Sequence, residues 1–289
     1  MEYLYYPGCS LKGQANFYEK SLLASFEKLQ IPLKELPDWN CCGATTYMSV
    51  DNKEAMAMAS RNIAIAEDHE QDIIAPCSAC YMVLNKAQKQ ISEYPELGKQ
   101  IRGALANAGL KLHGKRVQIR HPLDVLVNDY GIDNIKEVMV HKLNGSRIFP
   151  YYGCLIVRPT NAFDDPWYPL SMDHLLTALG CEVVDHSLKT KCCGGSLTGT
   201  IEAVGMRLVH ILLKEAKKKG VHGIVTLCPL CQFNLDAYQK KVQKIYNEKF
   251  NIPILYFTQL LGYALGIETD KLGFNQLIIP ANEFLNVIG

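Results

Sequence analysis

Ten of the eleven cysteines in this 289-residue chain follow one pattern that occurs twice. Each copy has a single cysteine, then a Cys-Cys-Gly triplet, then a Cys-x-x-Cys motif. The copies are Cys9, Cys41, Cys42, Cys77 and Cys80, then Cys154, Cys192, Cys193, Cys228 and Cys231. In both copies 34 residues separate the Cys-Cys pair from the Cys-x-x-Cys motif, whereas the first interval is 31 residues in one copy and 37 in the other. The pattern indicates a duplicated unit with an insertion in the second copy.

The residues around the cysteines repeat as well. The segment Tyr-Tyr-Pro-Gly-Cys at 5–9 is matched by Pro-Tyr-Tyr-Gly-Cys at 150–154. We therefore predict two homologous domains, 1–144 and 145–289, each with one site, the second also carrying the C-terminal tail. The length of the chain agrees with two domains. Because no Pro/Ser-rich linker divides them, we expect the two domains to be closely docked.

Strand-like and helix-like segments alternate in both halves. The expected strands are residues 3–6, 32–36, 73–75 and 117–120, then 147–152, 181–186, 224–227 and the start of 254–265. The expected helices include residues 16–29, 53–69 and 81–92, then 169–179, 201–219 and 233–250. This alternation predicts an α/β protein of two homologous Rossmann-like lobes, each a parallel sheet flanked by helices and related by pseudo-two-fold symmetry.

The predicted fold also places the cysteines. In an open parallel sheet, ligands bind beyond the carboxyl ends of the strands. Each of the ten patterned cysteines comes shortly after a predicted strand, so the five in each lobe should meet at one edge of its sheet. A pseudo-two-fold axis could then turn the two edges toward a shared cleft.

Composition narrows the class of chemistry. Eleven cysteines are too sparse for a small disulfide scaffold, and the odd number excludes complete pairing. The first residues lack the features of a secretory signal, and no apolar run is long enough to span a bilayer, so we expect a cytoplasmic protein without membrane insertion. Thiols stay reduced in that compartment, where clustered cysteines favour metal or redox chemistry. A net charge of +1 gives no reason to expect a nucleic-acid partner.

Five thiolates per lobe limit the possible metal centres. Thiolate sulfur favours iron–sulfur clusters, zinc or copper(I), and we expect Gly43 and Gly194 to let the backbone approach a bulky centre. Structural zinc and a cubane cluster each take four protein ligands. Either one cysteine per lobe is spare, or the centre is not a standard cube. Because a fifth cysteine occurs in both lobes, we favour a centre that is not a standard cube.

The repeated pattern resembles the duplicated CCG, or cysteine-rich, domain family over nearly the whole chain, and within it the B subunits of methanogen heterodisulfide reductases. The resemblance implies that each set of five cysteines binds a non-cubane [4Fe-4S] cluster and that the clusters flank the substrate. It implies an oxidoreductase of methanogenesis that reduces the coenzyme M–coenzyme B heterodisulfide to two thiols in one-electron steps. It also implies a multisubunit complex with a flavin-binding partner, a ferredoxin-like iron–sulfur partner and commonly a [NiFe] hydrogenase.

Two alternatives stay open. Zinc would suit the thiolates of one lobe. The chain would also suit an electron-relay subunit of another oxidoreductase, such as a succinate, lactate or glycolate dehydrogenase that exchanges electrons with a quinone. The sequence has no closely spaced cubane motifs. Their absence favours heterodisulfide reduction over electron relay, with electrons arriving from a separate subunit.

Other residues are weaker candidates. Cys181 lies outside both motifs and is expected in the core. Three cations near the cysteines, Lys12, Arg158 and Lys191, could bind the sulfonate and phosphate of the coenzymes or be solvated charges. His121 could donate a proton, although a simple hydrogen-bonded role is more common. The basic segments 217–219 and 240–249 are expected to be solvated or docking faces, and the apolar tail 272–289 to seal a core or an interface.

Overall fold

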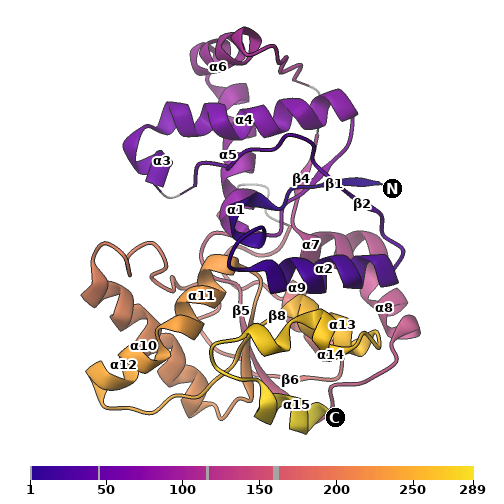
Figure 1. The fold of residues 1–289 in the computed structure, drawn as a ribbon, viewed down its shortest axis with the longest axis vertical. Helices are drawn as coiled ribbons and strands as arrows, with labels where there is room; N and C mark the ends of the chain where they lie inside the picture. The colour runs from indigo at the N-terminus through magenta and orange to yellow at the C-terminus, as the bar shows by residue number, and fades with distance from the viewer. Residues whose placement is uncertain (1, 45, 115–116, 159–162) are drawn as a thin grey trace.

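A computed structural model of the chain describes residues 2–44, 46–114, 117–158 and 163–289. In these residues each half of the chain holds one four-stranded parallel sheet (Figure 1). The strand orders are β2-β1-β3-β4 and β6-β5-β7-β8, so the second sheet repeats the topology of the first. The strands are β1 (Tyr3–Tyr5), β2 (Leu33–Glu35), β3 (Ile73–Ile74), β4 (Ile119–Arg120), β5 (Arg147–Tyr151), β6 (Glu182–Val183), β7 (Gly223–Thr226) and β8 (Ile254–Tyr256). The predicted fold class, two similar α/β lobes, is confirmed.

Helices cover both sheets. The first half contains α1 (Gly8–Leu11), α2 (Asn16–Lys28), α3 (Thr46–Val50), α4 (Asn52–His69), α5 (Ser78–Glu93), α6 (Pro95–Asn107), α7 (Pro122–Asp124), the π-helix η1 (Val125–Gly131) and α8 (Ile132–Val138). The second contains α9 (Ser171–Ala178), α10 (Glu202–Lys218), α11 (Pro229–Ala237), α12 (Gln239–Tyr246), α13 (Phe257–Ala264), α14 (Thr269–Leu272), the 3-10 helix η2 (Phe274–Gln276) and α15 (Asn282–Ile288).

Local chemistry explains where several of these elements lie. All residues of β1, β3, β7 and β8 are buried, as expected for short apolar strands covered on both faces. The side chain of Asp51 accepts the backbone N–H groups of Lys53 and Glu54 and so begins α4. The single helix expected over 233–250 is wrong: α11 ends before Tyr238, whose backbone leaves the helical region, and α12 follows. The helix α6, which begins at Pro95, was not predicted.

The two lobes dock through helices that follow equivalent strands. The helix α2 packs against α13 and α14, and α7 and α8 pack against α9. Figure 1 shows α2, α7 and α8 of the first half lying against the lower half of the molecule. At this junction Ser21 Oγ lies 2.7 Å from Thr258 Oγ1, and the ring of Tyr18 stacks on Tyr256 with centroids 4.0 Å apart. The lobes are therefore packed together, while the division at 144/145 stays a prediction.

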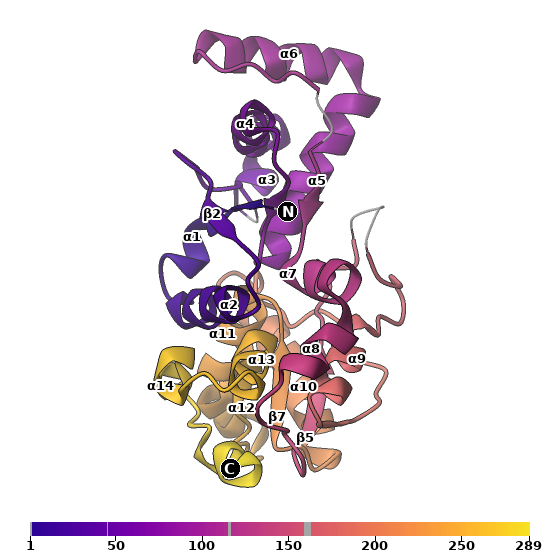
Figure 2. The same ribbon diagram turned by 90° about the vertical axis from the view of Figure 1, so that its right-hand side faces the viewer.

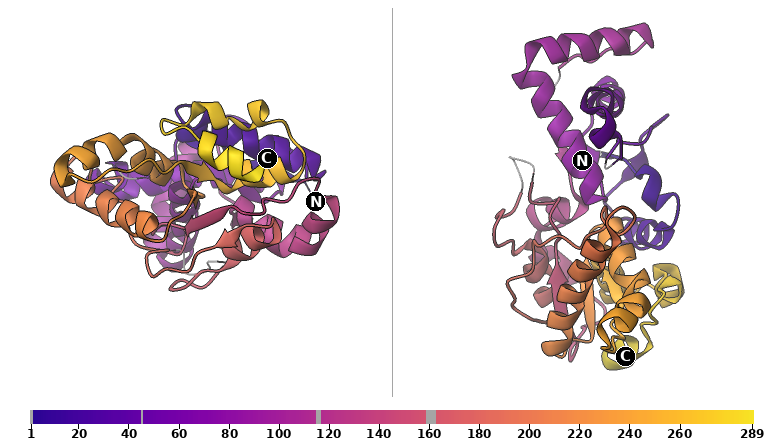
Figure 3. Two further views of the ribbon diagram at one scale, coloured as in Figure 1. Left: turned by 90° about the horizontal axis from the view of Figure 1, so that it is seen from below. Right: turned by 90° about the vertical axis from the view of Figure 1, so that its left-hand side faces the viewer.

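The ends of the molecule are formed by elements outside this junction. Figures 2 and 3 show α6 lying across α4 at the end of the molecule far from the C-terminus. The tail packs on its own lobe, because the carboxylate of Asp236 in α11 accepts the N–H groups of Ile278 and Ile279 at 2.9 Å each, and Phe284 is fully buried. The tail thus seals this chain's own core.

Among the described helices, none combines the length and the apolar character needed to cross a membrane.

Two buried histidines hold the loops that follow β4 and β6. Nε2 of His121 donates to Pro76 O and Nε2 of His186 donates to Pro150 O, both at 2.9 Å. Their Nδ1 atoms accept backbone N–H groups at 3.2 Å. Burial lowers the pKa of each imidazole to about 4. A neutral imidazole with both nitrogens bonded is structural, so the structure does not support the proton-donor role considered for His121.

The neutral His186 predicts a pH-dependent stability. Its folded pKa lies below the ordinary value, so between pH 6.5 and 4 the unfolded chain binds more protons. The free energy of unfolding should therefore fall with decreasing pH, by up to about 3 kcal/mol from this residue across that interval. Urea unfolding of the metal-free chain from pH 7 to 5 measures this slope. His186→Gln should make it shallower but not abolish it, because His121 contributes with the same sign, and the exposed His69→Gln is the control. An unchanged slope in His186→Gln would contradict the prediction.

Candidate functional site

In each lobe the carboxyl ends of three strands deliver the five patterned cysteines to one edge of the sheet. Cys9 and Cys154 follow β1 and β5, and the Cys-Cys pairs follow β2 and β6. The Cys-x-x-Cys motifs follow β3 and β7 and lie at the starts of α5 and α11. The structure therefore brings together the five cysteines of each copy, at the edge that the sequence predicted.

Contacts between the thiols are alike in the two lobes. In the first lobe Cys42 Sγ lies 3.3 Å from Cys80 Sγ, and in the second Cys193 Sγ lies 3.6 Å from Cys231 Sγ. The first cysteine of each copy hydrogen-bonds the first cysteine of its Cys-Cys pair. Burial is also alike: in each lobe the same three cysteines are buried, and the same two, Cys9 and Cys41 or Cys154 and Cys192, are at least partly exposed.

The hydrogen bonds favour the thiolate form at one equivalent position in each lobe. Bonds from the Cys42 and Cys9 thiols lower the pKa of Cys41 well below its ordinary value. A bond from the Cys154 thiol, helped by the N–H of Gly194 at 3.3 Å, lowers the pKa of Cys192 to about 6. The thiolate is the form that binds metals.

Glycines let the chain pass close to the thiols. A Cβ on Gly8 would lie 3.1 Å from Cys80 Sγ, and one on Gly153 would lie 2.9 Å from Cys231 Sγ. Both glycines have positive φ, and both precede the first cysteine of a copy. This role was not predicted from the sequence, although the repeated Gly-Cys step is a visible signal.

The glycines of the Cys-Cys-Gly triplets are also required by the packing of the neighbouring helices. A Cβ on Gly43 would meet the backbone of Ala55 in α4 at 3.3 Å. A Cβ on Gly194 would meet the backbone of Gly205 in α10 at 3.0 Å. Both glycines also have positive φ. The structure therefore shows that these glycines form a turn packed against a helix, while their role in the approach of a metal centre stays a prediction.

The two cysteine edges adjoin at the lobe junction. The helix α1, which carries Cys9, contacts α11, which carries Cys231. The hydroxyl of Tyr18 lies 3.4 Å from Pro76 O and 3.3 Å from Leu227 O, the carbonyls just before Cys77 and Cys228. A hydrogen bond to the Cys228 thiol, together with burial, raises the pKa of Cys77 well above its ordinary value. The first cysteines of the two Cys-x-x-Cys motifs thus meet across the junction.

A cleft of about 680 Å³ opens at the second site and is lined by both lobes. All five cysteines of the second copy line it. The first lobe contributes Met48, Val50 and Met82, which face Leu155 and Leu230 of the second. The described lining residues include no lysine, arginine, histidine, aspartate or glutamate. The cleft therefore offers thiols, apolar surface and the hydroxyl groups of serine, threonine and tyrosine to a ligand.

The candidate cations lie outside this cleft. Lys12 Nζ forms ion pairs with Glu19 at 2.7 Å and Glu35 at 2.8 Å, so its charge is already matched by two carboxylates. Arg158 and Lys191 are exposed, and neither lines the cleft. The described cleft wall thus gives no support to the idea that these three side chains bind the ends of a substrate there.

Cys181 lies at the other end of its sheet. It precedes β6, whereas the patterned cysteines follow their strands. Its side chain is buried, which raises the pKa of the thiol to about 11. It is a core residue separate from the thiol cluster.

The donor set fits an iron–sulfur cluster in each lobe. Five sulfur donors meet where glycines leave no Cβ in the way, and soft thiolates are the ligands that such clusters take. The described residues include no group of three or more His, Cys, Asp or Glu side chains placed to hold a single metal ion.

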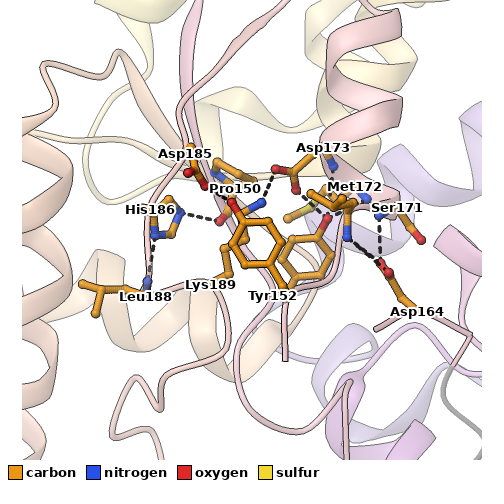
Figure 4. Close-up of polar contacts among 12 residues, drawn as sticks. Pro150, Tyr152, Asp164, Ser171, Met172, Asp173, Asp185, His186, Leu188 and Lys189 are labelled. Atoms are coloured by element: carbon orange, nitrogen blue, oxygen red, sulfur yellow. Dashed lines mark hydrogen bonds and ion pairs between the residues drawn. The ribbon is translucent and has the colours of Figure 1, made fainter. Parts of the chain in front are cut away.

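A polar network beside the second site was not foreseen. The buried Lys189 pairs with Asp173, which also accepts the hydroxyl of Tyr152, a cleft-lining residue (Figure 4). A lysine in a loop gives no sequence signal of burial.

Comparisons with known proteins agree with this geometry. The chain is 32% identical to the 8-methylmenaquinol:fumarate reductase membrane anchor subunit of Wolinella succinogenes, over 98% of both chains. It is 30% identical to the B subunit of the ferredoxin:CoB-CoM heterodisulfide reductase of Methanosarcina mazei, over 96% of this chain and 94% of that one. A hypothetical protein from Helicobacter pylori has a similar fold, with a TM-score of 0.77 at 14% identity over 96% of this chain; this chain spans 52% of that structure.

A family model decides the assignment. The model of the CCG cysteine-rich domain matches residues 3–85 and again residues 149–236, together more than half of the chain. Each match contains one complete five-cysteine set. The chain belongs to the CCG cysteine-rich domain family, and it carries the domain twice.

Proposed function

We propose that the chain is the disulfide-reducing iron–sulfur subunit of a multisubunit oxidoreductase, with the coenzyme M–coenzyme B heterodisulfide as its substrate. The observation that carries the proposal is the pair of matching five-thiol sets at adjoining edges, one of them opening into a cleft. A relative at 30% identity is named as the B subunit of a heterodisulfide reductase.

Each thiol set is proposed to hold one non-cubane [4Fe-4S] cluster. The ligands of the first would be Cys9, Cys41, Cys42, Cys77 and Cys80, and those of the second Cys154, Cys192, Cys193, Cys228 and Cys231. When bound, the clusters supply single electrons to a reaction that consumes two. The partners proposed to deliver these electrons are a ferredoxin-like iron–sulfur protein and a flavoprotein of the same complex, with a [NiFe] hydrogenase.

The residues of the chain would prepare this reaction in two ways. Met48, Val50 and Met82 line the cleft from the first lobe and place apolar surface near the thiols of the second. The contact between Cys77 and Cys228 keeps the two sites adjacent, so that both can serve one bound disulfide.

A second candidate function is electron exchange with a quinol. It is favoured by the apolar, charge-free lining of the cleft, which suits a neutral ring better than a substrate with anionic ends. A relative at 32% identity is named as a subunit of a methylmenaquinol:fumarate reductase.

Metal content tests the number of clusters. Chain purified without oxygen should contain about eight irons, with matching sulfide and negligible zinc, if two [4Fe-4S] clusters are bound. Elemental analysis and sulfide determination measure this. About four irons with one zinc would contradict a cluster in each lobe and support zinc in one of them.

Cysteine variants test the ligand assignment. Cys231→Ser should lose about half of the iron, because one of the two sites loses a buried ligand. Cys181→Ser should keep all of it, because Cys181 lies away from the thiol cluster. Iron content and the electron paramagnetic resonance spectrum of the reduced protein report both. Iron loss from Cys181→Ser equal to that from Cys231→Ser would contradict the assignment.

A substrate assay separates the two candidate functions. With reduced viologen as donor, the loaded chain should oxidise it when the heterodisulfide is added and not when a menaquinone analogue is added. Val50→Trp should lower the rate by about 10-fold or more, because the side chain would fill the mouth of the cleft. Ile245→Trp, an exposed residue of α12, is the matched control. Oxidation with the quinone analogue alone would favour the second function.

A further inference from the structure

The second lobe buries a lysine beside its thiol cluster. The side chain of Lys189 is 2% exposed, and its ammonium forms an ion pair with Oδ1 of Asp173 in α9. Nζ also lies 4.4 Å from the ring centroid of Tyr168. A lone buried ammonium would be strongly destabilising, so the geometry of this site depends on keeping the pair intact.

The other oxygen of Asp173 connects the ion pair to the segment that carries Cys154. Asp173 Oδ2 accepts the hydroxyl of Tyr152 at 2.6 Å, as Figure 4 shows. The Tyr152 oxygen in turn accepts the N–H groups of Met172 at 2.8 Å and Asp173 at 3.1 Å. The hydroxyl thus has three partners, all at the start of α9, which fixes the ring two residues before Cys154.

The backbone of Lys189 holds the same segment from the other side. Its carbonyl accepts the N–H groups of Tyr152 and Gly153, both at 3.0 Å. Lys189 also stands three residues before Cys192. One residue therefore joins the Cys154 segment, the Cys192 segment and, through Asp173, the helix α9.

The loop leading into α9 is fixed independently. The carboxylate of Asp164 accepts the N–H groups of Leu170 at 3.0 Å and Ser171 at 2.8 Å (Figure 4). The start of α9, to which the side chains of Lys189 and Tyr152 bond, is therefore itself held in place by Asp164.

The first lobe has a similar connection in an exposed form. Lys12 pairs with Glu19 in α2 and with Glu35, and the hydroxyl of Tyr5 donates to Glu19 at 3.2 Å. The Lys12 side chain is 38% exposed. Pro7 stands two residues before Cys9, where the second lobe has Tyr152, so the first lobe lacks this hydroxyl. Solvated ion pairs fix a structure much more weakly than buried ones whose partners are fully bonded.

We propose that Lys189, acting with Asp173 and Tyr152, is a positioning residue that fixes Cys154 as a cluster ligand. The second iron–sulfur site then depends on a buried ion pair, whereas the first does not. The inference rests on the proposed function in one respect, that Cys154 is a ligand. Cys154 is one of the two cysteines of its set that are not buried, so its placement depends on the backbone segment that this network holds. Contacts behind a ligand commonly set its orientation and the affinity of the site.

The test uses the full chain in two backgrounds that each keep one site. Cys42→Ser with Cys80→Ser leaves the second site, and Cys193→Ser with Cys231→Ser leaves the first. Each background is loaded with iron and sulfide without oxygen. Iron content, the paramagnetic resonance spectrum of the reduced protein and the rate of iron release to a chelator are then measured.

In the background that keeps only the second site, Lys189→Met should release iron about 10-fold faster and show an altered paramagnetic resonance spectrum. It should change neither measurement where only the first site remains. Lys189→Arg should restore slow release, because a guanidinium keeps the charge and the donors to Asp173. Lys12→Met, the matched change in the first lobe, should leave the second site unchanged.

An unchanged release rate and spectrum in Lys189→Met would overturn the proposal. Equal effects in both backgrounds would overturn it too, because they would show general destabilisation. If Lys189→Met does not fold, Tyr152→Phe keeps the ring, the ion pair and the two backbone bonds to Lys189 O, and loses only the bonds of the hydroxyl to Met172 and Asp173. Its second site should still show faster release, and no change would refute the proposal. Absence of iron from both backgrounds would instead overturn the proposed function, and this inference with it.

Discussion

Parallel pairing of short strands is the constraint on which the rest of the structure depends. Parallel strands end at a common edge, so residues far apart in sequence that follow β1, β2 and β3 must meet there. Five thiols gather at this edge in each lobe, and the equivalent pairs lie 3.3 and 3.6 Å apart. The close approach needs glycine before the first cysteine, because a Cβ on Gly8 or Gly153 would meet a thiol sulfur. The sites are thus a product of sheet topology and of two positions without a side chain.

Docking of the lobes brings the two thiol sites together and completes the cleft, which neither sheet could do alone. The hydroxyl of Tyr18 lies between the carbonyls that precede Cys77 and Cys228, and the two thiols meet across the junction. The first lobe also supplies one wall of the cleft at the second site. The chemistry proposed for the chain therefore takes place at the junction between the lobes. A change in the packing of α2 against α13 would alter the geometry of both sites.

The sequence predicted those features that local pattern and spacing determine. Alternating strand-like and helix-like segments gave the fold class, and the duplicated motif gave both cysteine sets and left Cys181 aside. What could not be predicted depends on contacts between distant residues. The burial of Lys189, the neutral state of His121 and the ion pairs of Lys12 follow from neighbours elsewhere in the chain. The packing of Gly194 against Gly205 of α10 could not be predicted for the same reason.

The contacts at the junction also bear on how such a chain could arise. The helix α9 occupies the place in the second lobe that α2 occupies in the first, and α13 corresponds in the same way to α7. The contact of α2 with α13 and that of α9 with α7 therefore join equivalent elements, although the first contact is the more extensive. A surface that pairs with itself in this manner closes as a symmetric dimer. In this chain both halves of the pairing belong to one molecule, so equivalent positions in the two halves can differ, as Pro7 and Tyr152 do.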